Sequence, residues 1–327
     1  MLSLILTVGF LSSCSDTHNK NIDSETVCER FDTTQENSSL NTETNIAESP
    51  VEDFEYKENE DGGITITRYM GNDKDVVIPK VIQDRIVTKI GNISFHLNSD
   101  IYSVTIPDSV VEIGGGAFAS CRNLKTVSLS TQLESIGNGA FEKTAITTIT
   151  FPQDLKSIGM RAFADCMNLK QVTIPKLSHC GEETFCGSGL ETVTIEEGLE
   201  TIPTAMFAST NIKEIIFPKS VKTICMNAFG SCKDLESVVL NEGLFSIDTY
   251  AFSNTKLMEI VIPKSVINLK NDAFLYCSNL QKVKFEGDAP NEYRSEFVDS
   301  SQYVIYYHKD SKGFTSPQWN GYPTEIW

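Results

Sequence analysis

The hydrophobic positions along the chain repeat every 22 or 23 residues. The clearest mark of the repeat is a segment such as residues 113–118, Ile-Gly-Gly-Gly-Ala-Phe, whose Phe recurs nine times. The nine positions are Phe95, Phe118, Phe141, Phe163, Phe185, Phe207, Phe229, Phe252 and Phe274. A fixed period in this range predicts a solenoid, in which each repeat stacks on its neighbours and shares one continuous core.

Within each repeat, a short stretch alternates apolar and polar residues, as in Val-Thr-Ile at 104–106 and again at 172–174. Side chains alternate between the two faces of a strand, so Val and Ile point inward and the middle residue points outward. A Pro often follows and ends the strand, and a later Ile-Gly pair permits the next turn. The pattern predicts a parallel strand ladder on one face and short helical or irregular turns on the other.

One repeat cannot fold alone. Ordering its residues costs more conformational free energy than the burial of its four or five apolar side chains returns. Stacking must supply the difference through shared burial and backbone hydrogen bonds between repeats. We therefore expect the nine Phe side chains to form a column inside the solenoid.

Three further features accompany the Phe positions: strands that end in Ile-Pro, Ile-Gly pairs, and Cys-x-Asn-Leu segments. The Ile-Gly pairs include residues 113–114, 136–137 and 158–159, and the Cys-x-Asn-Leu segments begin at Cys121, Cys166 and Cys277. Over about residues 53–327 this combination resembles the BspA-like (treponemal-type) leucine-rich repeat family. The resemblance implies a curved, strand-lined bacterial protein, secreted or anchored at the surface, that binds host or environmental macromolecules. It implies no catalytic residue.

The N-terminal part of the chain differs from the repeats. Residues 1–14 are apolar but too short to span a bilayer, and they are typical of a signal peptide. Their last four residues, Leu-Ser-Ser-Cys, resemble the bacterial lipobox, which implies lipidation at Cys14. The alternative is a disordered apolar N-terminus in a cytosolic protein.

The remaining sequence divides into four segments. Residues 15–52 are rich in Asn, Ser, Thr, Glu and Asp and predict an acidic flexible linker. Residues 53–91 carry fragments of the repeat and predict a β-rich N-terminal cap, 92–286 form the leucine-rich repeats, and 287–327 form a C-terminal cap. The chain is expected in the bacterial cell envelope, held by its lipid anchor, with the outer membrane facing outward as the favoured site.

Most of the negative charge lies in the predicted linker and cap. The formal net charge is −17, of which −11 falls within residues 15–61. The chain lacks the basic stripe that nucleic-acid binding needs. No cofactor is implied, and we expect a monomer that contacts the membrane only through its anchor.

The nine cysteines raise the question of disulfides or a metal site. Cys121, Cys166, Cys232 and Cys277 are equivalent but never occupy adjacent repeats. Strands ~4.8 Å apart would separate even the closest of them by roughly 10 Å, beyond the ~7 Å that a disulfide spans. Buried free thiols are predicted instead. Cys180 and Cys225 replace a repeat Ile and Gly, which also indicates core packing. His179, Cys180 and Cys186 form the one His/Cys cluster, and it lacks a fourth ligand, so no metal is expected.

The outward residue in the middle of each ladder strand changes character along the chain. In order these residues are Thr105, Ser128, Thr150, Thr173, Thr194, Ile216, Val239, Val261 and Lys284. Exposed Ile and Val in three consecutive repeats would form an apolar strip, with Glu214 and Glu259 at its rim, and such strips mark partner sites. Two alternatives to a partner site remain. Ile and Val could occur here only because β-branched residues are good strand formers, or a loop could cover the strip.

These observations favour a non-catalytic surface protein that binds or adheres through its strand face to a protein or glycan on host or neighbouring cells. The candidate binding residues are Glu214, Ile216, Val239, Glu259 and Val261. A glycan-capturing surface protein is the first alternative, because the Thr-rich half of the ladder suits hydroxyl-rich ligands. A hydrolytic enzyme is the less favoured one.

Overall fold

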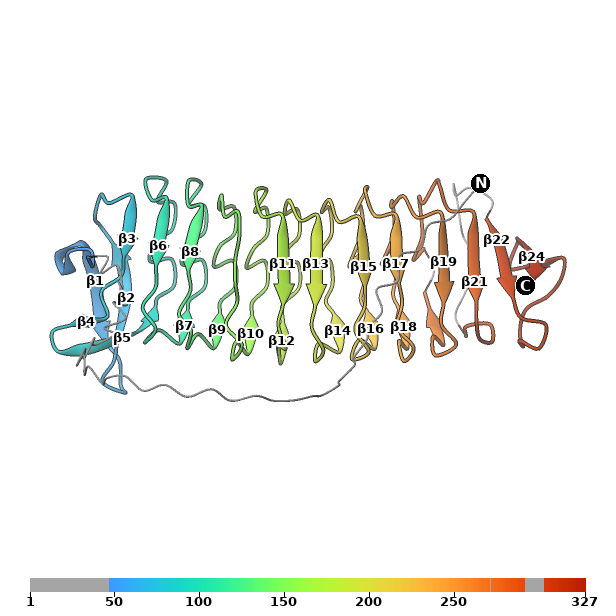
Figure 1. Ribbon diagram of the computed structural model, residues 1–327, viewed down its shortest axis with the longest axis horizontal. Coiled ribbons are helices and arrows are strands. Elements are labelled where there is room, and N and C mark those ends of the chain that lie inside the picture. The colour runs from blue at the N-terminus through green and yellow to red at the C-terminus, as the bar shows by residue number, and fades with distance from the viewer. Residues whose placement is uncertain (1–46, 271, 292–302) are drawn as a thin grey trace, which may run out of the picture. The chain divides into compact units, whose positions relative to one another are not determined.

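The computed structural model describes residues 47–270, 272–291 and 303–327. They belong to one compact unit, residues 46–327, which is a β-solenoid of stacked coils with β1 (Phe54–Glu58) near one end and β24 (Tyr322–Ile326) at the other (Figure 1). The predicted solenoid is confirmed. The turns that face away from the strands are irregular, since the single helix among the described residues is a 3-10 turn, η1 (Val51–Asp53).

The predicted parallel ladder runs along one face of the solenoid. Its strands are β3 (Asp75–Val77), β6 (Ser103–Thr105), β8 (Thr126–Ser128), β11 (Gln171–Ile174), β13 (Thr192–Ile195), β15 (Glu214–Ile216), β17 (Ser237–Val239), β19 (Glu259–Ile262), β21 (Lys282–Phe285), β22 (Val304–Tyr307) and β24. These strands form four hydrogen-bonded groups, β3-β6-β8, β11-β13, β15-β17 and β19-β21-β22-β24. Within each group equivalent residues pair in register, as Thr173 with Thr194 and Ile216 with Val239. The coil that contains residues 147–150 contributes no regular strand to this ladder, although its Ile149 is buried and its Thr150 exposed as the alternation requires.

A second parallel ladder, which the sequence analysis missed, is built from the Ile-Gly region of each coil. It contains β5 (Arg85–Ile90), β7 (Glu112–Ile113), β9 (Ser135–Ile136), β10 (Ser157–Ile158), β12 (His179–Cys180), β14 (Thr201–Ile202), β16 (Thr223–Ile224), β18 (Ser246–Ile247) and β20 (Asn268–Leu269). Its strand pairing is interrupted between β12 and β14. Most of these strands have two residues, one pointing out and one buried. Two residues are too few for an alternating pattern, so the sequence showed the buried Ile but not the strand.

A third set of backbone hydrogen bonds joins the turns around the Phe positions. Residues two before and two after each Phe have positive φ, as Arg161 (56°) and Asp165 (58°) do around Phe163. This backbone aims alternate N–H groups at the next coil: Arg161, Phe163 and Asp165 donate to the carbonyls of Glu182, Thr184 and Cys186. All three bonds run toward the C-terminus, and the same direction holds at the other Phe turns from Phe95 to Phe252.

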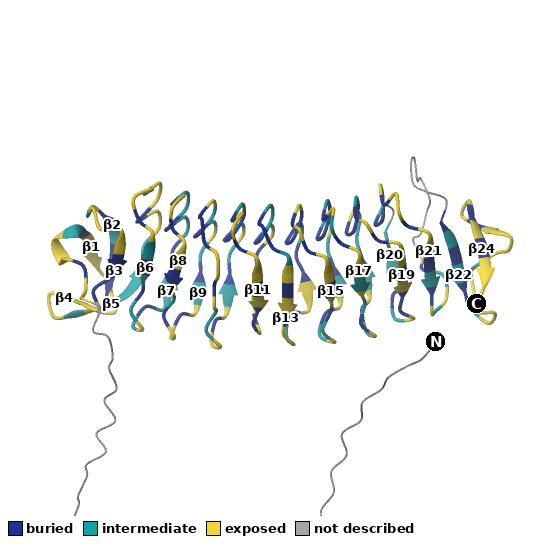
Figure 2. Cartoon of the chain, turned by 45° about the horizontal axis from the view of Figure 1, so that its top comes forward, coloured by how far each residue is buried: buried dark blue, intermediate teal, exposed yellow. Residues whose placement is uncertain are grey.

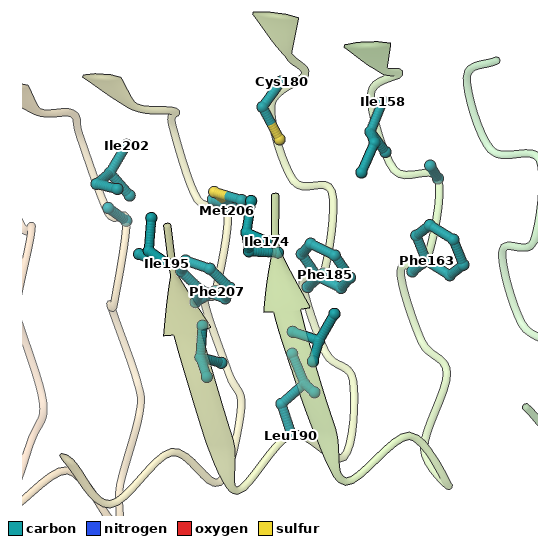
Figure 3. Close-up of a cluster of buried hydrophobic side chains, with 14 of the residues drawn as sticks. Ile158, Phe163, Ile174, Cys180, Phe185, Leu190, Ile195, Ile202, Met206 and Phe207 are labelled. Carbon is teal, nitrogen blue, oxygen red and sulfur yellow. The ribbon is translucent and has the colours of Figure 1, made fainter. Parts of the chain in front are cut away.

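The Phe column is confirmed. All nine rings are at most 2% exposed, and neighbouring rings stack with centroids 4.7–5.8 Å apart and planes within 25° of parallel. Figure 3 shows Phe163, Phe185 and Phe207 in this column, with Ile174 and Ile195 of the first ladder and Ile158, Cys180 and Ile202 of the second around them. The core is therefore one continuous stack enclosed by the two ladders and the Phe turns.

The first coil is closed by a β-hairpin. β1 pairs antiparallel with β2 (Ile64–Tyr69), β2 joins β5 in parallel, and the short β4 (Val81–Ile82) pairs antiparallel with β5. Phe54 and Tyr69 extend the ring column, with Tyr69 stacked 5.2 Å from Phe95. Contacts with the first coil begin within the predicted linker, where Ser49 is buried and its Oγ donates to Asp73. The domain boundaries themselves stay a prediction.

The other end is closed by β22 and β24, which continue the first ladder in parallel. β23 (Gln318–Trp319) folds back antiparallel on β24. Aromatic side chains fill this end: Phe285 contacts Phe314 and Trp319, and Tyr303 stacks on Tyr322 at 4.5 Å.

Four equivalent cysteines lie in the core as buried free thiols: Cys121, Cys166, Cys232 and Cys277. Three of them, Cys166, Cys232 and Cys277, lie against a buried Thr of the preceding coil. Thr144 Oγ1, for example, lies 3.3 Å from Cys166 Sγ and donates to the Phe141 carbonyl. Burial raises the pKa of the Cys166 thiol to about 11. The thiols therefore stay protonated at neutral pH and fill space while their S–H groups find carbonyl partners.

Candidate functional site

The apolar strip, Ile216, Val239 and Val261, lies on the outer face of three successive ladder strands. The exposed fractions of these side chains are 66%, 51% and 36%. β15 and β17 hold Ile216 opposite Val239, while β19 places Val261 opposite Lys284. The strands form because Ile215 and Ile260 are buried at the alternating positions, which forces their outward neighbours into water.

The rim of the strip carries both charges. Glu259 pairs with Lys284 at 3.1 Å, and Lys284 Nζ also lies 5.6 Å from the centre of the Trp327 ring. Glu214 is exposed beside Ile216 and has no ion-pair partner among the described residues. The carboxylate at the C-terminal end of the strip, Glu259, is thus paired with a lysine, whereas the carboxylate at its N-terminal end, Glu214, is free to pair with a partner's cation.

The five candidate residues therefore share one continuous face. No described segment covers them, since all five are exposed; Figure 2 shows the exposed bands along these strands. The function of the strip stays a prediction.

A hollow of about 560 Å³, which the repeat pattern did not predict, lies on the Thr-rich half of the same ladder. It spans three coils and is lined by Thr150, Phe151, Gln153, Gln171, Thr173, Pro175, Thr192, Thr194 and Glu196, among others. One available signal was the coil that ends at Phe185, which has one residue fewer than its neighbours between Pro175 and Leu177. Two further hollows, of about 640 and 790 Å³, border the same shortened corner at Leu177 and Ser178.

The His/Cys cluster does not form a site. His179 is exposed on β12, while Cys180 points into the core beside the second ladder. Burial raises the pKa of Cys180 to about 11 and also raises the pKa of the half-buried Cys186. Such thiols are poor ligands and nucleophiles at neutral pH. Across the described ranges, no three His, Cys, Asp or Glu side chains are grouped to hold a metal ion.

Some predictions concern residues outside the described part of the chain. Cys14, the signal-like segment 1–14 and all but the last residues of the predicted linker 15–52 belong to this group. Within the described part, no helix is long and apolar enough to cross a membrane.

The coils, the ladders and the exposed strand face define a leucine-rich-repeat β-solenoid. The model of the BspA type leucine rich repeat region matches in six copies over residues 88–210 and 200–310. The chain therefore belongs to the BspA-type leucine-rich repeat family. A search of curated proteins gives no match.

Solved structures with the same fold include a leucine-rich repeat protein from Bacteroides ovatus, at 24% identity and a TM-score of 0.72, covering 86% of this chain and 77% of that one. A leucine rich cell surface protein from Faecalibacterium prausnitzii shares 23% identity with a TM-score of 0.59, over 86% and 94% of the two chains. The T. pallidum leucine-rich repeat protein shares 24% identity with a TM-score of 0.50, over 72% and 91%.

Proposed function

We propose that this protein is a non-catalytic cell-surface binding or adhesion protein that holds a partner protein against its strand face through the apolar strip. The observation that carries the proposal is the run of three exposed, in-line aliphatic side chains on consecutive ladder strands. Contiguous exposed apolar surface of this kind is typical of protein contact sites. The family, whose members serve surface binding or adhesion in general, supports the same function.

The rim indicates what the partner should offer. An apolar patch on the partner would cover Ile216 and Val239, and a Lys or Arg beside it would pair with the free carboxylate of Glu214. A basic partner also suits the folded repeats, because the chain outside residues 15–61 still carries a net charge of −6. Such a contact speeds association at low salt and weakens as salt rises.

The location belongs to the proposal as well. Lipidation at Cys14 would anchor the chain in the bacterial envelope, and residues 15–52 would hold the solenoid away from the membrane. The F. prausnitzii structure, which is described as a cell surface protein, supports a surface location for this fold. Growing the expressing bacterium with an alkyne-bearing fatty acid should label the natural chain and leave Cys14→Ser unlabelled. Equal labelling of the two would overturn the anchor.

The binding proposal is tested with the full-length chain and a panel of purified extracellular-matrix proteins on a biosensor surface. Val239→Asp places a charge in the centre of the strip, and its exposed position keeps the fold intact. We expect at least about a tenfold loss of affinity for any matrix protein that the natural chain binds, which corresponds to roughly 1.4 kcal/mol. Glu214→Lys should weaken the same interaction.

Ser128→Asp is the matched control, because Ser128 is an exposed outward residue of the same ladder several coils away. It should leave binding unchanged. Undiminished binding by a folded Val239→Asp chain rules out the strip, and equal losses in both variants would show that added charge, rather than the strip, is responsible.

A further inference from the structure

The hollow on the Thr-rich half of the ladder borders the corner that is one residue shorter than its neighbours, at Pro175–Leu177. At several corners after the ladder strands, side chains tie adjacent coils together: Glu197, for example, accepts hydrogen bonds from the backbone N–H groups of Lys219 and Ser220, at 3.0 and 2.9 Å. The shortened corner at Pro175–Leu177 makes no such tie to Gln153 or Asp154 within the described structure. The surface is left recessed where neighbouring coils meet.

The lining of the hollow is rich in groups that both donate and accept hydrogen bonds. Thr150, Thr173 and Thr194 stand in one row, and Gln171 and Thr192 stand beside them on the strands. All five are exposed, and none of these side chains makes a hydrogen bond to another described residue. By contrast, the hydroxyl of Ser103, farther along the ladder, is already bonded to Asp75 at 2.6 Å. The hollow thus offers a set of uncommitted hydroxyl and amide groups.

One wall of the hollow is aromatic. The Phe151 ring is half-buried, packing edge-on against Phe163 at 5.5 Å and 70°. Its equivalent two repeats after the shortened coil, Phe217, packs in the same way on Phe229 but is only 4% exposed. A ligand with an apolar face could therefore lie against Phe151 and remove that surface from water.

The charge of the lining narrows the ligand class. Glu196 is the one charged residue among the lining residues, and no Lys or Arg lines the hollow. A phosphate, sulfate or uronate would meet an uncompensated carboxylate and no cation, which disfavours anions. The volume of about 560 Å³ lies within the roughly 300–1,000 Å³ typical of small-ligand sites.

We propose that this hollow is a binding site for a neutral oligosaccharide. Sugar hydroxyls donate and accept in the same way as the Thr hydroxyls and Gln amides, and the C–H face of a pyranose ring matches Phe151. The site lies on different coils from the apolar strip, so it is independent of the proposed protein partner.

The test uses the full-length chain with cellotriose, maltotriose, mannotriose and chitotriose as probes, and saturation-transfer NMR followed by titration as the measurement. At least one trisaccharide should bind, and Thr173→Trp, which fills the hollow, should weaken it at least tenfold. Ser128→Trp adds the same bulk on the same ladder outside the hollow and should change nothing. Gln171→Ala is a milder second variant and should weaken binding severalfold with the thermal unfolding profile unchanged.

An insertion tests the origin of the site. Adding one Ser between Lys176 and Leu177 gives this corner the length found at 218–221, and it should close the hollow and abolish trisaccharide binding while the Thr row stays in place. Trigalacturonate should bind more weakly than every neutral probe that binds. The proposal is overturned if no trisaccharide binds, if folded Thr173→Trp and Gln171→Ala chains both bind as well as the natural one, or if the charged probe binds best. Val239→Asp should leave sugar binding intact, which separates this site from the proposed function.

Discussion

Replacing Phe163 by Ala tests the physical basis of the whole solenoid. The Phe163 ring is fully buried between Phe141 and Phe185, with centroids 5.2 and 5.5 Å away and planes tilted by only 13° and 10°, and Phe151 contacts its edge. Truncating a buried Phe costs about 3–5 kcal/mol through lost burial and the cavity left behind. Each aromatic contact that is lost costs about a further 0.5–1.5 kcal/mol beyond the burial of the ring. We therefore expect Phe163→Ala to lower the free energy of unfolding by about 5 kcal/mol, the upper end of this range.

The assay is urea unfolding followed by circular dichroism and by intrinsic fluorescence. Because stacked repeats can unfold in parts, a gap between the two transitions in the Phe163→Ala chain would show that the column has been cut there. Phe245→Ala is the matched control: Phe245 is 46% exposed on the other side of the coil and should cost under about 1 kcal/mol. A loss below about 1 kcal/mol at Phe163, or equal losses at the two positions, would refute the stacked-core argument.

Two further predictions concern groups inside and on the Phe turns. Burial raises the pKa of Cys166 from 9.0 to about 11, so the stability that comes from keeping this thiol protonated is complete below pH 9 and is lost as the pH rises to about 11. The unfolding free energy of a Cys166→Ala chain should fall less steeply over that pH window than that of the natural chain. Identical slopes would contradict the raised pKa. Arg161 bridges neighbouring turns by pairing with Glu142 at 3.0 Å and with Glu183. In the same unfolding assay, Arg161→Gln should lower the free energy of unfolding by about 1 kcal/mol, and by less at high salt. Lys156→Gln, which removes a more exposed ion pair, should lower it by under about 0.5 kcal/mol.

Nearly all of the core of this fold could be predicted from the sequence. The Phe period placed Phe95 through Phe274 in one column, and the Val-x-Ile triplets placed the first ladder, because burial recurs at fixed offsets whenever each repeat must cover the next. The second ladder escaped notice because pairs such as Ser135–Ile136 are too short to alternate. The missing strand around Thr150 could not be foreseen either, since its apolar pattern matches that of its neighbours.

Surface properties were less accessible from the sequence. The outward positions of Ile216 and Val239 followed from the period, because inward and outward residues alternate strictly on a strand. The hollow at Thr173 could not be predicted in this way. The shortened corner is visible in the sequence, but a recess beside it depends on how three coils pack against one another in space. The identity of the ligand depends on surface residues that differ from coil to coil, and a repeat pattern describes only the positions that all coils share.

The uniform direction of the hydrogen bonds at the Phe turns makes the two ends of the solenoid chemically different. The turns from Phe95 to Phe252 donate from their N–H groups toward the C-terminal side and accept at their carbonyls from the N-terminal side, and Tyr69 of the first cap likewise donates its N–H to the carbonyl of Ser94. A cap must therefore supply donors at one end and acceptors at the other, and the two caps cannot be exchanged. By the same rule, coils gained or lost during evolution can only be added head to tail, which lengthens or shortens the face in whole steps of about 4.8 Å and leaves the chemistry of the remaining coils unchanged.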